Sequence, residues 1–352
     1  MSEKESIEEQ QDVNDDLFER FVLKVDKGQE PLRIDKFLKA RIENATRNKI
    51  QQAINAGLVS VNKAIIKQNY KIKPFDEIIV YSDMSPQDTE VVPEKIDFTI
   101  VYEDEDVMVI NKVAGMVVHP GSGNYRGTLL NGIAWYLQQK DPTITDEVLP
   151  RFGLVHRIDK NTSGLLLVAK NEKSLSHLAK QFFDHTVQRN YTALVWGDFK
   201  EDEGIVNAHI GRNLRSRKLF EAYPEGDHGK EAITHFKVLE RFNYVTLVEC
   251  RLETGRTHQI RVHMKHLNHP LFNDDFYGGD KIVKGTVFTK YRQFVDNCFS
   301  ICARQALHAK TLGFIHPTTK KEMFFETELP DDMKQVIEKW KKYSLIKGLI
   351  EE

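Results

Sequence analysis

The pattern of apolar and polar residues predicts an α+β fold in two domains. A small N-terminal segment, residues 21–85, contains two amphipathic helices and three short strand-like pieces. A larger segment, residues 98–335, interleaves strand-like runs with helices, but without the steady β-α-β spacing of a doubly wound parallel sheet. With 352 residues, of which 40% are hydrophobic, the chain is long enough to bury a core in each domain.

Charge is distributed unevenly along the N-terminal part of the chain. Residues 1–20 carry eight acidic and two basic side chains, a net charge of −6, and are expected to form a disordered arm. Residues 21–75 carry twelve basic and four acidic side chains, a net charge of +8. Such a module is typical of proteins that bind a polyanion, although charge alone equally fits a solvated basic face.

The basic module is predicted to begin with two helices. Residues 32–42 and 47–56 each place apolar side chains on one helical face, and Gly57 is expected to end the second helix. Short strand-like pieces follow at 58–61, 64–66 and 78–81. The segment therefore predicts a compact helix–turn–helix with a small β appendage.

This module resembles the S4 RNA-binding domain. The resemblance is carried by the run RIDKFL at 33–38, by Arg47, and by the turn GLVSVN at 57–62. Arg33 and Arg47 are then expected to contact RNA phosphates, which position a protein without reading bases. The polar residues 86–97 that follow are expected to be a linker to the larger domain.

The densest group of charged residues in the larger domain lies in PRFGLVHRIDKNTSGLLLVAK, residues 150–170. Arg157 and Asp159 precede a turn and then an apolar, strand-like run at 165–169. Charged side chains beside a buried strand need partners, because burying them alone is unfavourable. A structural ion pair and a catalytic carboxylate both fit this pattern, and spacing alone does not choose between them.

The segment HRIDKNTSG, residues 156–164, resembles the catalytic H-R-[LI]-D motif of the RluA/RluD family of pseudouridine synthases. The resemblance implies that Asp159 is the catalytic aspartate and that Arg157 supports a flipped nucleotide. The chain departs from the family pattern at Ile158, where leucine is more usual, and at Asn161, where aspartate is common. Neither departure touches the implied chemistry.

Two further segments bear on substrate binding. QRNYTALVWG at 188–197 resembles the family segment whose tyrosine packs against the target uracil, which points to Tyr191. GRNLRSRKLF at 211–220 contains Arg212 and Arg215 and no acidic residue. It is expected to follow the RNA backbone near the active site, although a solvated basic loop has the same composition.

The longest family signature is LETGRTHQIRVHMKHLNHPLFND, residues 252–274. It implies that Arg261 pairs with Asp159 and that Arg256 and His258 contact the substrate. If the segment is extended around Arg261, that side chain faces the site while the preceding isoleucine faces the core.

No cofactor or metal is indicated. The chain has neither a GxGxxG nor a GxxxxGK[ST] loop to hold a nucleotide phosphate. Cys250, Cys298 and Cys302 do not have the number or spacing of a zinc knuckle or a disulfide framework. The four histidines between 258 and 269 have no carboxylate or cysteine at a metal-like spacing, which disfavours zinc.

The resemblance implies an enzyme of the RluD-like branch with a mixed, mainly antiparallel sheet in its catalytic domain. Its expected reaction converts uridine to pseudouridine in 23S ribosomal RNA, in the helix 69 loop. The expected partner is ribosomal RNA, with no obligate protein partner. No membrane is expected, because no apolar run approaches roughly 20 residues. The N-terminal residues contain no apolar leader, which favours the cytoplasm.

Several points remain open at this level. A non-catalytic RNA-binding factor in ribosome assembly and a metal-dependent hydrolase are the alternatives from other functional classes. The sequence does not decide whether Asp159 attacks C1′ of the ribose or removes a proton from C2′. Residues 336–352 are expected to be a C-terminal tail, helical or frayed, of unassigned purpose.

Overall fold

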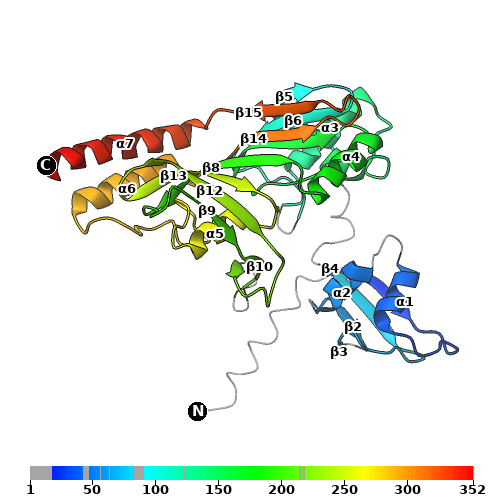
Figure 1. Ribbon diagram of the computed structural model, residues 1–352. Helices are drawn as coiled ribbons and strands as arrows, with labels where there is room; N and C mark the ends of the chain where they lie inside the picture. Colours follow the sequence, from blue (N-terminus) through cyan, green and yellow to red (C-terminus); the bar gives the residue numbers. More distant parts are fainter. Residues whose placement is uncertain are drawn as a thin grey trace, which may run out of the picture. The chain divides into compact units, whose positions relative to one another are not determined.

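The computed structural model describes residues 18–42, 47–55, 57–62, 64–82, 91–121, 124–213, 216 and 219–351 (Figure 1). The chain divides into two compact units. The first comprises Met1–Val91 with Pro120–Tyr125, and the second Val92–His119 with Arg126–Glu352. Each unit has its own sheet and helices, so the predicted α+β class is confirmed.

The first unit is a small antiparallel sheet covered by two helices. The strands follow the order β1 (Phe18–Lys24), β4 (Glu77–Ser82), β2 (Val59–Val61) and β3 (Ala64–Ile65). The helices are α1 (Ile34–Arg41) and α2 (Arg47–Asn55). Their predicted apolar faces form the core, which includes Ile34, Phe37, Leu38, Ile50 and Ile54.

Two local features of this unit can be compared with the sequence. Gly57 has a φ of +74°, and the amides of Gly57 and Leu58 donate to the carbonyls of Ile54 and Ala53. This is the glycine-terminated helix end that the sequence indicated. By contrast, β1 begins at Phe18, so the last three residues of the segment 1–20, expected to be a disordered arm, form a strand that pairs with β4. The other residues of that arm lie outside the described ranges.

The second unit is built on a nine-stranded mixed sheet. Eight strands follow the order β5 (Thr99–Glu103), β6 (Val107–Lys112), β7 (Ser163–Ala169), β14 (Leu307–Ile315), β8 (Gln188–Trp196), β13 (Val245–Leu252), β12 (Ile233–Arg241) and β9 (Glu203–Asn207), and β15 (Glu322–Glu326) pairs with β14. The pairing of β7 with β14 is parallel, and the other recorded pairings are antiparallel. The expected mixed, mainly antiparallel sheet is therefore confirmed.

Helices and a short ribbon complete this unit. The helices are α3 (Leu129–Lys140), α4 (Glu172–Phe183), α5 (Gln259–His266), α6 (Thr289–Ile301) and α7 (Asp331–Glu351), and the ribbon pairs β10 (His209–Arg212) with β11 (Phe220–Tyr223). The described residues include no helix that is both long and apolar enough to cross a membrane.

The C-terminal segment belongs to the core of the second unit. The boundary expected at 335/336 falls inside α7, because Val336 and Trp340 are fully buried with Trp196 of β8 and Phe272. Figure 1 shows α7 beside α6 at one end of this unit. The sequence predicts a C-terminal tail at 336–352, helical or frayed, and the structure shows a helix that begins before this segment, at Asp331.

Part of the segment 86–97, which was expected to be a linker, packs against the second unit. Residues 83–90 lie outside the described ranges, but the carbonyl of Val92 accepts a hydrogen bond from Asn131 Nδ2 at 2.8 Å, and the Glu94 amide donates to the Asn131 carbonyl. The part of the linker from Val92 onward therefore packs on α3 as part of the second unit.

Candidate active site

Asp159 lies in a turn that is fixed by a buried strand. The turn connects the short 3₁₀ helix η3 (Pro150–Gly153) to β7. Every residue of β7 is buried. Gly164, at the start of β7, has a φ of +114°, and a Cβ atom there would lie 2.2 Å from the carbonyl oxygen of Ala309 on β14. Glycine is therefore required where the two parallel strands meet, and the position of the turn follows from that contact.

Two buried cations hold the same turn through its carbonyl groups. The Nζ atom of Lys112 donates to the carbonyls of Val113, Met116 and Lys160 at 2.8–2.9 Å. Burial, with repulsion from Arg304, lowers the pKa of Lys112 to about 7. As an ammonium, Lys112 has one donor for each of these three carbonyls, and as a neutral amine it has two.

Arg304 is the second of these cations. Its Nη1 atom donates to the carbonyl of Asn161 at 3.0 Å, and its Nε atom pairs with Asp332 of α7 at 2.7 Å. The C-terminal helix is thereby connected to the turn that carries Asp159. Sequence reasoning assigned no role to Lys112, Arg304 or Asp332, because their partners lie far away in the chain.

The carboxylate of Asp159 is paired with Arg261. Arg261 Nη1 lies 3.1 Å from Asp159 Oδ2, and the Arg261 side chain is only 4% exposed. A second carboxylate, that of the fully buried Asp274, accepts from Arg261 Nε at 2.7 Å and from Nη2 at 2.9 Å. Burial opposes the charge of Arg261, but hydrogen bonds and attraction from Asp274 and then Asp159 raise its pKa overall.

The local structure around Arg261 differs from the extended segment considered above. Residues from Gln259 onward form α5, and both Ile260 and Arg261 are buried. The helix explains why neighbouring side chains can both leave solvent, since they point to different parts of the interior. Asp274 lies in the last position of the family signature, but nothing in the pattern indicated that it would hold the arginine.

His258 is the other polar group near Asp159. Its Nε2 atom lies 3.9 Å from Asp159 Oδ1, and its Nδ1 atom is 2.8 Å from the Tyr277 hydroxyl. Burial lowers the pKa of His258; the charge of Asp159 opposes this shift, and that of Arg261 adds to it. A histidine with a lowered pKa is neutral near pH 7 and presents imidazole, not imidazolium, to the carboxylate.

Tyr191 lies on β8, with a side chain that is 6% exposed. Burial raises the pKa of its hydroxyl, so the phenol is neutral in the physiological range. The residues Leu252, Ile260 and Leu307 line the cavity with it and are apolar. A flat apolar wall with one phenol is suited to the face of a pyrimidine base.

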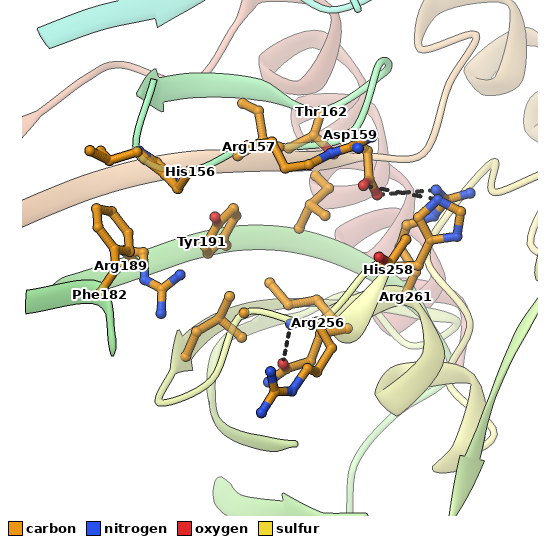
Figure 2. Close-up of a pocket in the computed structure, with 18 of the residues that line it drawn as sticks. His156, Arg157, Asp159, Thr162, Phe182, Arg189, Tyr191, Arg256, His258 and Arg261 are labelled. Atoms are coloured by element: carbon orange, nitrogen blue, oxygen red, sulfur yellow. Dashed lines mark hydrogen bonds and ion pairs between the residues drawn. The ribbon is translucent and has the colours of Figure 1, made fainter. Parts of the chain in front are cut away.

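These residues line one cavity of about 520 Å³. Figure 2 shows Tyr191 on one wall and the Asp159–Arg261 pair at one end. Arg157, Arg256 and His258 also line it, so six of the site residues expected from the sequence lie together. The cavity offers a paired carboxylate, an aromatic wall and several cations, which fit a sugar, a base and a phosphate.

Comparison with known proteins shows which family combines these parts. A family model described as RNA pseudouridylate synthase matches residues 106–266, and a model described as S4 domain matches residues 32–78. An uncharacterized RNA pseudouridine synthase of Chlorobaculum parvum is 46% identical over 318 residues, covering 90% of this chain and 96% of that protein. This chain belongs to the RNA pseudouridine synthase family.

This pseudouridine synthase belongs to the RluA family and has an N-terminal S4 domain. A protein of Zymomonas mobilis named ribosomal large subunit pseudouridine synthase D is 39% identical over 303 residues, with 86% of this chain and 91% of that protein covered. The solved structure of human RNA pseudouridylate synthase domain containing 4 has a TM-score of 0.54 at 20% identity, covering 69% of this chain and 92% of that one. The human structure supports the fold, and the family makes the protein an isomerase.

Three other residues predicted from the sequence, Arg33, Arg47 and Arg212, are not among those that line the cavity. Arg33 and Arg47, in the S4 domain, both pair with Asp35, at 3.1 Å and 3.0 Å. Asp35 is fully buried, and its pKa stays well below the usual range because hydrogen bonds from Gln51 and the two arginines outweigh burial. The arginine side chains are 40% and 47% exposed, so they are fixed in position and still reach solvent.

The basic stretch at 211–220 is described only in part. Arg212 ends β10, is exposed, and lies 4.6 Å from the centre of the Phe220 ring. Arg215 lies outside the described residues. The described residues contain no cluster of three or more ligating side chains that could hold a metal ion. All three cysteines are free and buried, and burial raises the pKa of each to about 12.

Proposed function

We propose that this enzyme converts uridine to pseudouridine in RNA of the large ribosomal subunit, with Asp159 as its catalytic residue. The observation that carries the proposal is the Asp159 carboxylate, which is held 3.1 Å from a buried arginine at the end of a cavity walled by Tyr191. Relatives named ribosomal large subunit pseudouridine synthase D support the choice of RNA. The finer target, the helix 69 loop of 23S ribosomal RNA, follows from the RluD-like motifs.

The reaction breaks the C1′–N1 bond of uridine, turns the uracil, and joins C1′ to C5. The C5 proton is lost and N1 gains one, so atoms balance without a redox step or a cofactor. Asp159 either attacks C1′ or removes the C2′ proton, and an ionised carboxylate is required for both. Arg261 balances the charge of this carboxylate and fixes its direction, while Asp274 fixes Arg261.

The rest of the cavity acts on the base. A uridine inside an RNA fold must leave its stack to reach Asp159, at a cost of a few kcal/mol. Tyr191 provides a surface on which the flipped uracil can stack, and Arg157 and Arg256 provide positive charge at the cavity wall. Phosphate contacts by the S4 domain would supply binding energy that offsets the flipping.

The test is a map of pseudouridines in ribosomal RNA from a strain that lacks this gene. We expect the loss of pseudouridine at discrete large-subunit positions, restored by the wild-type gene but not by Asp159→Asn. Unchanged ribosomal RNA would refute the proposed substrate. Restoration by Asp159→Asn would instead favour a non-catalytic role in ribosome assembly.

A further inference from the structure

The active-site cavity continues past Tyr191 to an end that the reaction described above does not use. This end is formed by the last turn of α4 and the first residues of β8, with Phe182, Phe183, His185 and Arg189 on its walls. Arg189 and Tyr191 are two residues apart on β8, so they share a face about 7 Å apart along the strand. In Figure 2, Arg189, Tyr191 and Asp159 follow one another across the pocket.

Arg189 is a buried cation that pairs with no carboxylate of the described residues. Its side chain is 7% exposed, its Nε atom has no hydrogen-bond partner, and no ion pair joins it to any acid in the described part of the chain. Among its neighbours are the Phe182 ring, 5.3 Å from the guanidinium carbon, and the backbone at Gly255. Burying a charge without a partner is strongly unfavourable. Arg261 and Arg304, two other buried arginines of the same unit, each pair with an aspartate.

Arg189 provides positive charge at this end, whereas the neighbouring His156 does not. His156 Nε2 accepts a hydrogen bond from the Leu167 amide, which places the ring proton on Nδ1. Burial and the charge of Arg189 lower the pKa of His156 to about 3, so it is neutral at pH 7. Its Nδ1 atom is a second buried donor that has no partner within the described ranges, and its ring stacks on Phe182 at 4.6 Å.

An exposed aromatic ring lies at the same end. Phe183 is 82% exposed, although it is the last residue of a helix whose apolar face packs on the sheet. Phe183 and Arg189 line the same cavity. Proteins that bind single-stranded nucleic acid combine such parts, an aromatic ring on which a base stacks and a cation that contacts a phosphate. The cavity therefore combines an anion site with a surface for a base.

We propose that Arg189 and Phe183 form a subsite for the nucleotide next to the target uridine. Arg189 binds the phosphate between the two nucleotides, and Phe183 stacks on the neighbouring base. The subsite rests on the proposed function only in that its ligand is RNA. Because Arg189 and Tyr191 share one strand face, the subsite fixes the neighbouring nucleotide while the uracil lies against Tyr191.

The test measures equilibrium binding in the Asp159→Asn background, so that no turnover occurs. The probe is a hairpin RNA with one uridine in its single-stranded loop, and its affinity is measured over a range of salt concentrations. Loss of one single-strand phosphate contact should reduce the slope of log affinity against log salt by about 0.7 in Arg189→Met. Phe183→Ala should weaken binding roughly tenfold without changing the slope.

Matched controls are available outside the cavity. Arg241 pairs with Asp198 and Asp202 and does not line the cavity, so Arg241→Met should leave the slope unchanged. Phe324 on β15 is 59% exposed, and Phe324→Ala should bind as the parent does. If Arg189→Met has the same slope as Arg241→Met, and Phe183→Ala the same affinity as Phe324→Ala, the subsite does not exist.

A second measurement avoids dependence on the folding of a variant. A neutral methylphosphonate is placed at each phosphate flanking the uridine, one at a time, and binding to the parent protein is measured. We expect one position to reproduce the slope of Arg189→Met, and the variant to be insensitive there. No sensitive position in the parent would overturn the proposal. Failure of the proposed ribosomal substrate would be seen separately, as unchanged ribosomal RNA in the deletion strain.

Discussion

The two units of this synthase contain buried aspartate–arginine clusters of opposite design. In the S4 domain, one fully buried carboxylate, Asp35, holds Arg33 and Arg47 with their guanidinium groups partly in solvent. In the catalytic unit, Asp274 holds Arg261 out of solvent, and that arginine holds Asp159 at the cavity. The first cluster presents cations, as binding phosphates requires, and the second presents a carboxylate, as chemistry at a ribose requires.

The largest effect on activity is expected from substitution of Asp159, the carboxylate that the second cluster presents at the cavity. Asp159→Asn keeps the shape of the side chain but removes its charge, and we expect pseudouridine formation to be abolished. The fold and the affinity for RNA should stay near those of the wild type. The measurement is single-turnover conversion, with circular dichroism and RNA binding as controls. Residual activity within tenfold of the wild type, about 1.4 kcal/mol in the barrier, would contradict the assignment.

Asp274→Asn should act on Asp159 indirectly, because Asp274 pairs with Arg261 and Arg261 pairs with Asp159. The change leaves the buried Arg261 with only Asp159 as its carboxylate partner, and breaking a buried pair costs about 3–5 kcal/mol. We expect a lower free energy of unfolding and a large fall in the rate at saturating RNA. Chemical denaturation and single-turnover kinetics measure the two effects. A variant with wild-type turnover would show that Asp274 does not position Arg261 and Asp159 for the reaction.

Lys112→Met tests the support of the turn that contains Asp159. It leaves three carbonyls without their donor, and we expect a loss of about 2 kcal/mol of stability, with reduced turnover. The pKa of this lysine falls from 10.5 to about 7 on folding, so between these values the unfolded chain binds more protons. The stability of the wild type relative to the variant should therefore rise with pH from 7 to 10. A flat difference would mean that the lysine titrates alike in both states.

The smallest effect is expected at the surface of the first cluster. Arg33→Gln removes one phosphate contact, and we expect the slope of log affinity against log salt to fall by about 0.7–0.9. Turnover at saturating RNA should be unchanged, because the S4 domain is assigned to docking. Arg241→Gln is the matched control for loss of a charge. Equal slopes for the two variants would show that Arg33 makes no RNA contact.

The sequence was most informative where function depends on residues close together in the chain. The HRID turn and the TGRTHQIRVH signature pointed to Asp159, Arg261 and His258, and the structure brings all three to one cavity. Supports such as Lys112 and Arg304 were missed, because a lysine that donates to a carbonyl 48 residues away leaves no local pattern. Arg189 was missed for a related reason, since an unpaired cation in a strand is conspicuous only once its surroundings are known.

The fold, too, could be predicted from the sequence where the signal lies in residues close together in the chain. Amphipathic helices such as α1 and α2, with a glycine to end the second, could be predicted from local periodicity. The extended geometry considered for the segment around Arg261 was wrong, because α5 is stabilised by packing and not by a strong local signal. The docking of α7 depends on Trp340 meeting Trp196 and Phe272, three residues that come together only in the folded unit.

The central claim is that the two clusters do different work, one binding RNA and the other performing the reaction. The most direct test compares Arg33→Gln and Asp274→Asn in one assay that yields both the dissociation constant for RNA and the single-turnover rate at saturation. We expect Arg33→Gln to weaken binding and keep the rate, and Asp274→Asn to lower the rate and keep the binding. If both variants change the same parameter, the division of work between the clusters is wrong.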